Sequence, residues 1–325
     1  MLVAFASAIA GQPSHAGQSY IWTVTGKVPA SQMGLTLSHE HVMSNFGGDT
    51  RHDPDYDEVK LVAQVEPYLE KMKALGAETI VDCTTAWFGR DVRILRELSQ
   101  RTGVNIVTNT GYYAAAKDRY VPPSAYEETV EQIAARWIQE FETGIDDTGI
   151  RPGFIKLGFD HGPPSEIDLK LFRSGLLAHK ATGLTIAVHT GANVEAAQMQ
   201  LDMLDAHEIS PSSWIWTHAN KMGSVEPLIE AARKGAWISL DGVRQSTIEN
   251  HLSYLQAFKD AQLLDHILLS HDGNSFPRGG AIRSYEAIFT HLIPAMQASG
   301  FSETEINSLL VENPRRTFAL LAQKE

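Results

Sequence analysis

The amino-acid sequence predicts a single-domain α/β protein with the (β/α)8, or TIM-barrel, fold. Eight short β-rich runs alternate with longer segments of helical periodicity. A doubly wound sheet would more often show about five or six such runs. The chain has 325 residues, 43% of them apolar, which is enough to bury one large core. Beyond roughly residue 20, no repeat, low-complexity tract or Pro/Ser-rich linker divides it.

The predicted strands are short apolar runs with many β-branched residues. They span residues 35–41, 79–82, 105–109, 154–157, 185–189, 214–218, 237–240 and 267–270. The helical segments between them include residues 59–75, 125–143, 170–182, 196–207 and 225–234. Several helical segments stop at a glycine, as helices often do: Gly76, Gly103, Gly144, Gly183 and Gly235.

Composition excludes several classes of partner. The formal net charge of −12 argues against binding nucleic acid or an anionic membrane surface, because both attract basic proteins. No run approaches the roughly 18 apolar residues that a membrane span requires. The lone cysteine, Cys83, provides neither a disulfide framework nor a thiolate metal site, and its apolar surroundings predict a small buried side chain.

The N-terminal segment, residues 1–20, has two interpretations. Residues 2–10 are small and apolar, and Ala8-Ile-Ala10 has the A-x-A form of a signal-peptidase site. However, no Lys or Arg precedes Lys27, so the charged start of a signal peptide is missing. The segment is therefore either a signal remnant or an N-terminal arm. An exported or periplasmic location and a cytoplasmic one are equally open, and the barrel is expected over residues 21–325.

Polar residues with metal-binding chemistry stand where the predicted strands end. Alternation along the first strand puts His39 and His41 on one face and Glu40 on the other. In a parallel barrel the active site lies at the carboxyl ends of the strands. Singly, such residues are usually a hydrogen-bonded histidine, a snorkelling lysine or a helix N-cap aspartate. Together they indicate a metal site, with the candidate ligands His39, His41, Lys156, His189, His218 and Asp272.

The ligand types favour two divalent cations. Imidazole and carboxylate together suit zinc, with manganese, cobalt or iron(II) as alternatives. Lys156 lies in an apolar run, and dications beside it would drive its ammonium to lose a proton. The neutral amine could take up carbon dioxide to form a carbamate that bridges metals roughly 3.5–4 Å apart. Zinc-finger, H-E-x-x-H and G-x-S-x-G patterns are absent from the sequence.

These motifs resemble a known family. Gly34-Leu-Thr-Leu-Ser-His-Glu-His41 is similar to the opening signature of the phosphotriesterase family, within the amidohydrolase superfamily. Ile155-Lys156, His189-Thr-Gly, Thr217-His218, Ser270-His-Asp272 and Glu312-Asn-Pro-Arg-Arg316 follow in the family's order, over nearly all of residues 20–320. The resemblance implies that His39, His41 and Asp272 hold the more buried metal and that His189 and His218 hold the more exposed one. Carboxylated Lys156 would bridge them. His271 and Gly273-Asn274 depart from the family pattern by making the start of the last loop unusually polar.

The expected reaction is hydrolysis of an ester bond. A metal-bridging hydroxide would attack the substrate, and Asp272 would accept the proton. Family members tuned to phosphotriesters tend to have tryptophan where this chain has Tyr113, whereas lactonases of the family resemble this chain in having tyrosine there. Tyr113 would then hydrogen-bond the hydroxide or a substrate carbonyl. The sequence is equally compatible with Tyr113 as an aromatic residue of the pocket wall whose hydroxyl is solvated. A lactone or carboxylic ester is favoured, with a phosphotriester as the alternative.

Arginines near the last two strands favour a polar small-molecule substrate. Residues 273–284 are rich in Gly and Arg and contain no leucine. Arg244, Arg278 and Arg283 would face an anionic or hydroxylated substrate, unless they are solvated rim residues. Two rival classes fit less well: a mononuclear deaminase would lack Lys156, and a non-catalytic metal-binding barrel would have lost ligands. The sequence leaves a homodimer open.

Overall fold

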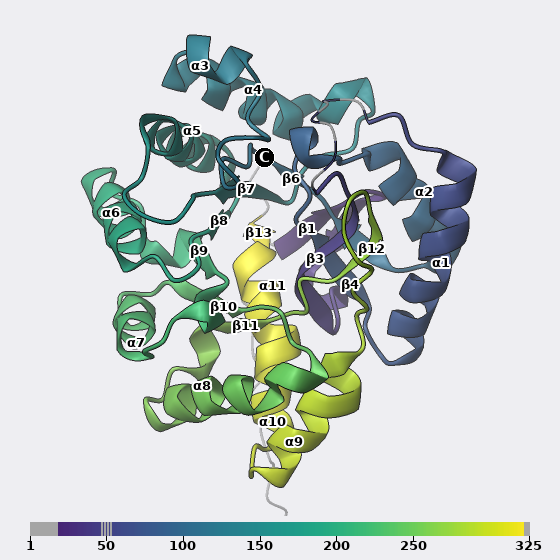
Figure 1. Cartoon of the computed structure of the whole chain (residues 1–325), viewed down its shortest axis with the longest axis vertical. Helices are drawn as coiled ribbons and strands as arrows, with labels where there is room; N and C mark the ends of the chain where they lie inside the picture. Colours follow the sequence, from purple (N-terminus) through teal and green to yellow (C-terminus); the bar gives the residue numbers. More distant parts are fainter. Residues whose placement is uncertain (1–18, 47, 49, 51, 53, 322–325) are drawn as a thin grey trace, which may run out of the picture.

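The computed structural model describes residues 19–321 except 47, 49, 51 and 53, and these residues form a (β/α)8 barrel (Figure 1). The predicted fold is thus confirmed. The barrel strands are β3 (Thr36–Ser44), β4 (Thr79–Asp82), β5 (Asn105–Val107) with β6 (Asn109–Thr110), β7 (Phe154–Gly158), β8 (Ile186–His189), β9 (Trp214–Thr217), β10 (Trp237–Leu240), and β11 (Ile267–Leu269) with β12 (Asn274–Pro277).

The barrel closes between its first and last strands. Parallel ladders run from β6 to β11 in chain order, and a second set runs β12-β3-β4-β5. Residues 270–273 interrupt the last strand between β11 and β12. Here the backbone N–H of Asp272 donates to the carbonyl of His39 at 3.1 Å, and that of His41 donates to the carbonyl of Gly273 at 2.9 Å. This closing seam therefore brings residues 270–273 against two of the candidate ligands.

Helices cover the outside of the barrel (Figure 1). Their bounds are α1 (Glu58–Ala74), α2 (Val92–Thr102), α3 (Ser124–Glu127), α4 (Val130–Thr143), α5 (Glu166–Thr182), α6 (Val194–Ala206), α7 (Glu226–Arg233), α8 (Ile248–Asp260), α9 (Ile293–Ala298), α10 (Glu303–Asn307) and α11 (Asn313–Phe318). One difference from expectation is that residues 125–143 form two helices. Thr129 caps α4 by accepting from the backbone N–H of Gln132, so the helix begins there.

Alternating side chains on each strand build two hydrophobic layers. On β4, Val81 points into the barrel interior while Ile80 packs outward against the helices, and on β9 Ile215 and Trp216 divide in the same way. Cys83 joins the interior layer and is buried, as predicted. The apolar interior fills the amino-terminal part of the barrel, which leaves the carboxyl ends of the strands for polar groups.

An N-terminal hairpin that the sequence did not indicate closes the bottom of the barrel. Strands β1 (Ser19–Thr23) and β2 (Gly26–Pro29) pair antiparallel, and β1 also pairs with β13 (Leu320–Leu321). Ile21 and Phe318 join the interior cluster there. The predicted signal remnant or arm falls almost wholly on residues 1–18, outside the described residues. None of the described helices combines the length and the apolar character needed to cross a membrane.

Candidate metal centre

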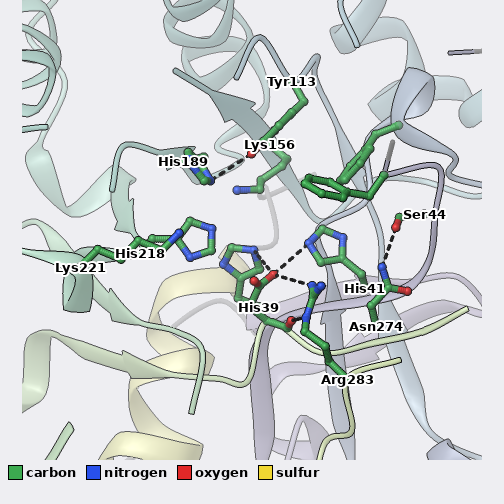
Figure 2. A pocket seen from close by; sticks show the side chains of 13 residues that line it. His39, His41, Ser44, Tyr113, Lys156, His189, His218, Lys221, Asn274 and Arg283 are labelled. Atoms are coloured by element: carbon green, nitrogen blue, oxygen red, sulfur yellow. Dashed lines mark hydrogen bonds and ion pairs between the residues drawn. The ribbon is translucent and has the colours of Figure 1, made fainter. Parts of the chain in front are cut away.

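A cavity of about 210 Å³ opens at the carboxyl ends of the strands (Figure 2). All six expected metal ligands line it, and so does Tyr113. The remaining lining residues are Ser44, Phe46, Phe88, Lys221, Asn274 and Arg283. Ligand atoms of His39, His218 and Asp272 all lie within 4.8 Å of one another, which is close enough to share a cation.

Three of the histidines have one ring nitrogen held by a neighbouring group. Nδ1 of His41 lies 2.9 Å from Oγ1 of Thr84, whose hydroxyl donates to the carbonyl of Met43. The Thr84 oxygen therefore accepts from Nδ1 of His41, which leaves Nε2 facing the pocket. Nδ1 of His39 and of His218 lie 3.1 and 3.4 Å from Oδ2 of Asp241. Such outer partners fix a metal-binding histidine's tautomer and orientation.

Asp241, which sequence reasoning missed, is the buried anion behind these histidines. It directly follows β10, and its carboxylate also accepts from the backbone N–H of His218 at 2.7 Å and from the Ser239 hydroxyl at 2.6 Å. Burial alone would lower the pKa of His39, but the electrostatic influence of Cys83 and of the adjacent Asp241, which also hydrogen-bonds the ring, raises it above the ordinary value. Asp241 thus stabilises positive charge at His39, which is what a bound cation would supply. Its signal was its position at a strand end.

Asp272 remains an ionised carboxylate. Burial favours its protonation, but hydrogen bonding to His41 and the charges of His39 and Arg283 hold its pKa well below the usual range. Oδ1 lies 3.3 Å from Nε2 of His41. An ionised carboxylate beside imidazole rings is a set of ligand types that suits a divalent cation.

Two of the candidate ligands have strained backbone conformations. His218 and Asp272 both adopt left-handed conformations, with φ of 58° and 49°. Such conformations cost free energy for residues other than glycine and persist where neighbouring contacts enforce them. The enforcing contacts are the bond from His218 N–H to Asp241 and the bond from Asp272 N–H to His39.

Lys156 meets the conditions for the expected bridging ligand. Its side chain is 1% exposed, and Nζ has no hydrogen-bond partner in the described structure. Burial lowers its pKa, which favours the neutral amine needed for reaction with carbon dioxide. A buried amine without a hydrogen-bond partner costs free energy unless another group in the cavity bonds to it. The residues present therefore fit a carboxylated lysine and two cations.

Tyr113 reaches the metal pocket from beyond β6. Its hydroxyl lies 3.1 Å from Nδ1 of His189, and burial raises its pKa, so it stays protonated (Figure 2). The ring stacks on Phe88 with centroids 5.3 Å apart. Gly158 makes this placement possible, because a Cβ there would lie 2.6 Å from the Tyr113 ring.

Glu40 anchors the Asp272 loop from outside the pocket. The carboxylate is fully buried and accepts from the Ser270 hydroxyl, the backbone N–H and Nδ1–H of His271, and the Gly273 N–H. Nε2 of His271 accepts from the Ile288 N–H, so this side chain points away from the cavity. The polar loop start that departs from the family pattern is thus an ordered support for Asp272.

The three candidate substrate arginines occupy different environments. Arg283 lines the metal pocket, and its Nε donates to the Asp272 carbonyl at 2.6 Å. Arg244 lines a neighbouring cavity of about 340 Å³ that also contacts Arg283. Arg278 lies over the Tyr56 ring at 4.2 Å and donates to the Asp55 carbonyl, and it does not line the metal pocket.

Comparison with known proteins agrees with this geometry. A family model described as the phosphotriesterase family matches residues 19–318. A phosphotriesterase homology protein of Escherichia coli is 27% identical over 292 residues, 88% of this chain and 98% of that protein. An aryldialkylphosphatase of Saccharolobus solfataricus is 25% identical over 90% of this chain and 97% of its own length. A solved variant of a PTE-like lactonase from Deinococcus radiodurans has a TM-score of 0.83 at 26% identity, covering 92% of this chain and 99% of that one.

The metal pocket, the barrel and the match over most of the sequence lead to one assignment. The ligand types present suit divalent cations, and the relatives that match most of this chain include an aryldialkylphosphatase and a PTE-like lactonase, which are hydrolases. This chain therefore belongs to the phosphotriesterase family of metal-dependent hydrolases.

Proposed function

We propose that this enzyme hydrolyses small polar lactones or carboxylic esters with two divalent cations, zinc being favoured. His39, His41 and Asp272 would hold the inner cation, His189 and His218 the outer one, and carboxylated Lys156 would bridge them. When bound, the cations supply an activated water nucleophile and an electrophilic pull on the carbonyl oxygen. The chain's own groups orient the substrate and move the proton.

The observation that carries the choice of a carbonyl substrate is the position of Tyr113. Its protonated hydroxyl lies against His189 in the metal pocket, where it can donate to a carbonyl oxygen as negative charge develops. Asp272 accepts the proton released by the nucleophile. The cavity of about 210 Å³ is smaller than the roughly 300–1,000 Å³ typical of drug-sized ligand sites, which favours a small substrate. The similarity to a solved PTE-like lactonase supports the same choice.

Tyr113→Phe tests this function because it removes only the hydroxyl. A preorganised donor of this kind is worth on the order of 3 kcal/mol, so lactone or ester turnover should fall about a hundredfold. Cleavage of a paraoxon-type triester relies more on the cations and should change much less. Both rates are measured with the metal content of each preparation defined. Equal losses would make Tyr113 a wall residue instead.

Phosphotriester hydrolysis is the second candidate. The similarity to an aryldialkylphosphatase supports it, as does the aromatic wall that Phe46, Phe88 and Tyr113 contribute to the cavity. A wild-type enzyme that strongly prefers triesters over lactones and esters would establish this alternative. Well under one metal ion per purified chain, with no hydrolysis at all, would point to a non-catalytic binding barrel.

A further inference from the structure

One positively charged side chain in the metal pocket has no assigned role. Lys156, Lys221 and Arg283 all line the cavity. Lys156 is the proposed bridging ligand, and Arg283 is engaged by Asp272, with 2.6 Å from Nε to the carbonyl oxygen and 3.4 Å from Nη2 to Oδ1. Within the described part of the chain, Nζ of Lys221 has neither an ion-pair nor a hydrogen-bond partner.

The backbone that carries Lys221 is fixed relative to the metal ligands. Lys221 ends the short turn η5 (Ala219–Lys221), which begins directly after His218. The Lys221 N–H donates to the His218 carbonyl at 3.1 Å, and Oδ1 of Asn220 accepts from the Asp241 N–H at 3.1 Å. The turn is therefore tied to the same aspartate that positions His39 and His218.

Lys221 lies on the His218 side of the pocket (Figure 2). Figure 2 shows Lys221 beside His218, on the side of the pocket opposite Asn274 and Ser44. The side chain itself is exposed, so it can meet a ligand with little desolvation.

The charge of the pocket lining contrasts with that of the whole chain. The protein carries a formal charge of −12, yet the carboxylate among the lining residues is Asp272, a candidate metal ligand. Two bound dications would make the pocket more positive still. A neutral substrate would leave the Lys221 ammonium without an ion-pair partner, whereas an anionic group on the substrate would pair with it.

We propose that Lys221 binds an anionic group of the substrate, placed on the His218 side of the reacting carbonyl. The group is a carboxylate, sulfonate or phosphate, which share the chemistry that an ammonium recognises. This inference rests on the proposed function, because it names the class of lactone or ester that the enzyme prefers.

The kinetic test compares two lactones that differ only in charge, γ-carboxy-γ-butyrolactone and its primary carboxamide. Wild-type enzyme should favour the carboxylate by about tenfold in kcat/KM, and Lys221→Met should remove most of that preference. Lys221→Arg should keep it. Lys60→Met, which removes an exposed lysine from helix α1, serves as the matched control and should change neither rate. The preference should also shrink as salt is raised, because the Debye length falls.

A binding measurement on the metal-loaded enzyme needs no turnover. Glutarate and glutaramate each offer one carboxylate to the cations, but only glutarate has a second anionic end. Calorimetry should show glutarate binding about tenfold more tightly to wild type and equally with glutaramate to Lys221→Met. Replacing the second carboxylate by a sulfonate or a phosphonate then ranks the three anionic classes.

The outcomes separate this inference from the proposed function. Turnover of both lactones without a charge preference, or equal losses of both rates in Lys221→Met, would overturn the role of Lys221. If neither lactone is hydrolysed, the proposed function fails. The comparison of glutarate with glutaramate then still decides whether Lys221 binds an anionic group. Equal affinities of wild type for glutarate and glutaramate would show that Lys221 is an ordinary solvated lysine.

Discussion

Replacing Glu40 by glutamine should destabilise the barrel at its closing seam. The carboxylate is buried and accepts four hydrogen bonds, three at Oε1 and one, of 2.5 Å from the Gly273 N–H, at Oε2. In Glu40→Gln the amide oxygen can keep the three, but the amide NH2 then faces the Gly273 N–H, donor against donor. A buried donor left without an acceptor costs about 1–3 kcal/mol. Loss of the negative charge also weakens the three hydrogen bonds accepted at Oε1. A neutral amide costs less to bury than a carboxylate, which offsets part of the lost stability.

The expected net loss in the free energy of unfolding is therefore about 3 kcal/mol, measured by urea denaturation of the metal-loaded protein. Glu286→Gln is the control, because Glu286 forms a partly exposed ion pair with Lys71 at 2.7 Å, and its loss should be within about 1 kcal/mol. Since Asp272 belongs to the same loop, Glu40→Gln should also bind metal less tightly. A loss below about 0.5 kcal/mol in Glu40→Gln, with normal metal content, would refute the assignment of Glu40 as the anchor of this loop.

Three further substitutions test the site. Lys156→Ala should abolish nearly all activity and regain part of it with added acetate or propionate, whose carboxylate can replace the bridge; wild-type-like turnover without such rescue would contradict the binuclear site. Asp272→Asn keeps the side chain's shape but removes the proton acceptor, so turnover should fall by roughly 10²–10⁴-fold, and unchanged turnover at full metal occupancy would assign the proton to another group. Gly273→Ala places a Cβ 2.4 Å from the Tyr285 ring and 2.7 Å from Oε2 of Glu40, so it should lower the free energy of unfolding by about 1–3 kcal/mol, and a neutral effect in urea denaturation would mean that Tyr285 moves aside freely.

Local pattern in the sequence was sufficient for the barrel and for the candidate ligands. Strand and helix periodicities are properties of neighbouring residues, and the predicted strands 79–82 and 237–240 coincide with β4 and β10. Because parallel strands bring their carboxyl ends to one mouth, strand-end residues far apart in the chain were expected to converge. The structure places His39, His41, Lys156, His189, His218 and Asp272 around one cavity.

Tertiary structure alone decided which groups support and surround those ligands. Glu40 meets His271 across 231 positions of sequence, and Tyr113 meets His189 across 76. Asp241, the partner of two candidate ligands, is marked in the sequence only by its position at a strand end. Lys221, whose Nζ has no partner in the described structure, has no distinguishing local pattern. The hairpin that closes the barrel bottom depends in the same way on pairing with residues near the other end of the chain. Such pairings follow from how the strands are offset when the barrel closes, and local periodicity carries no information about that offset.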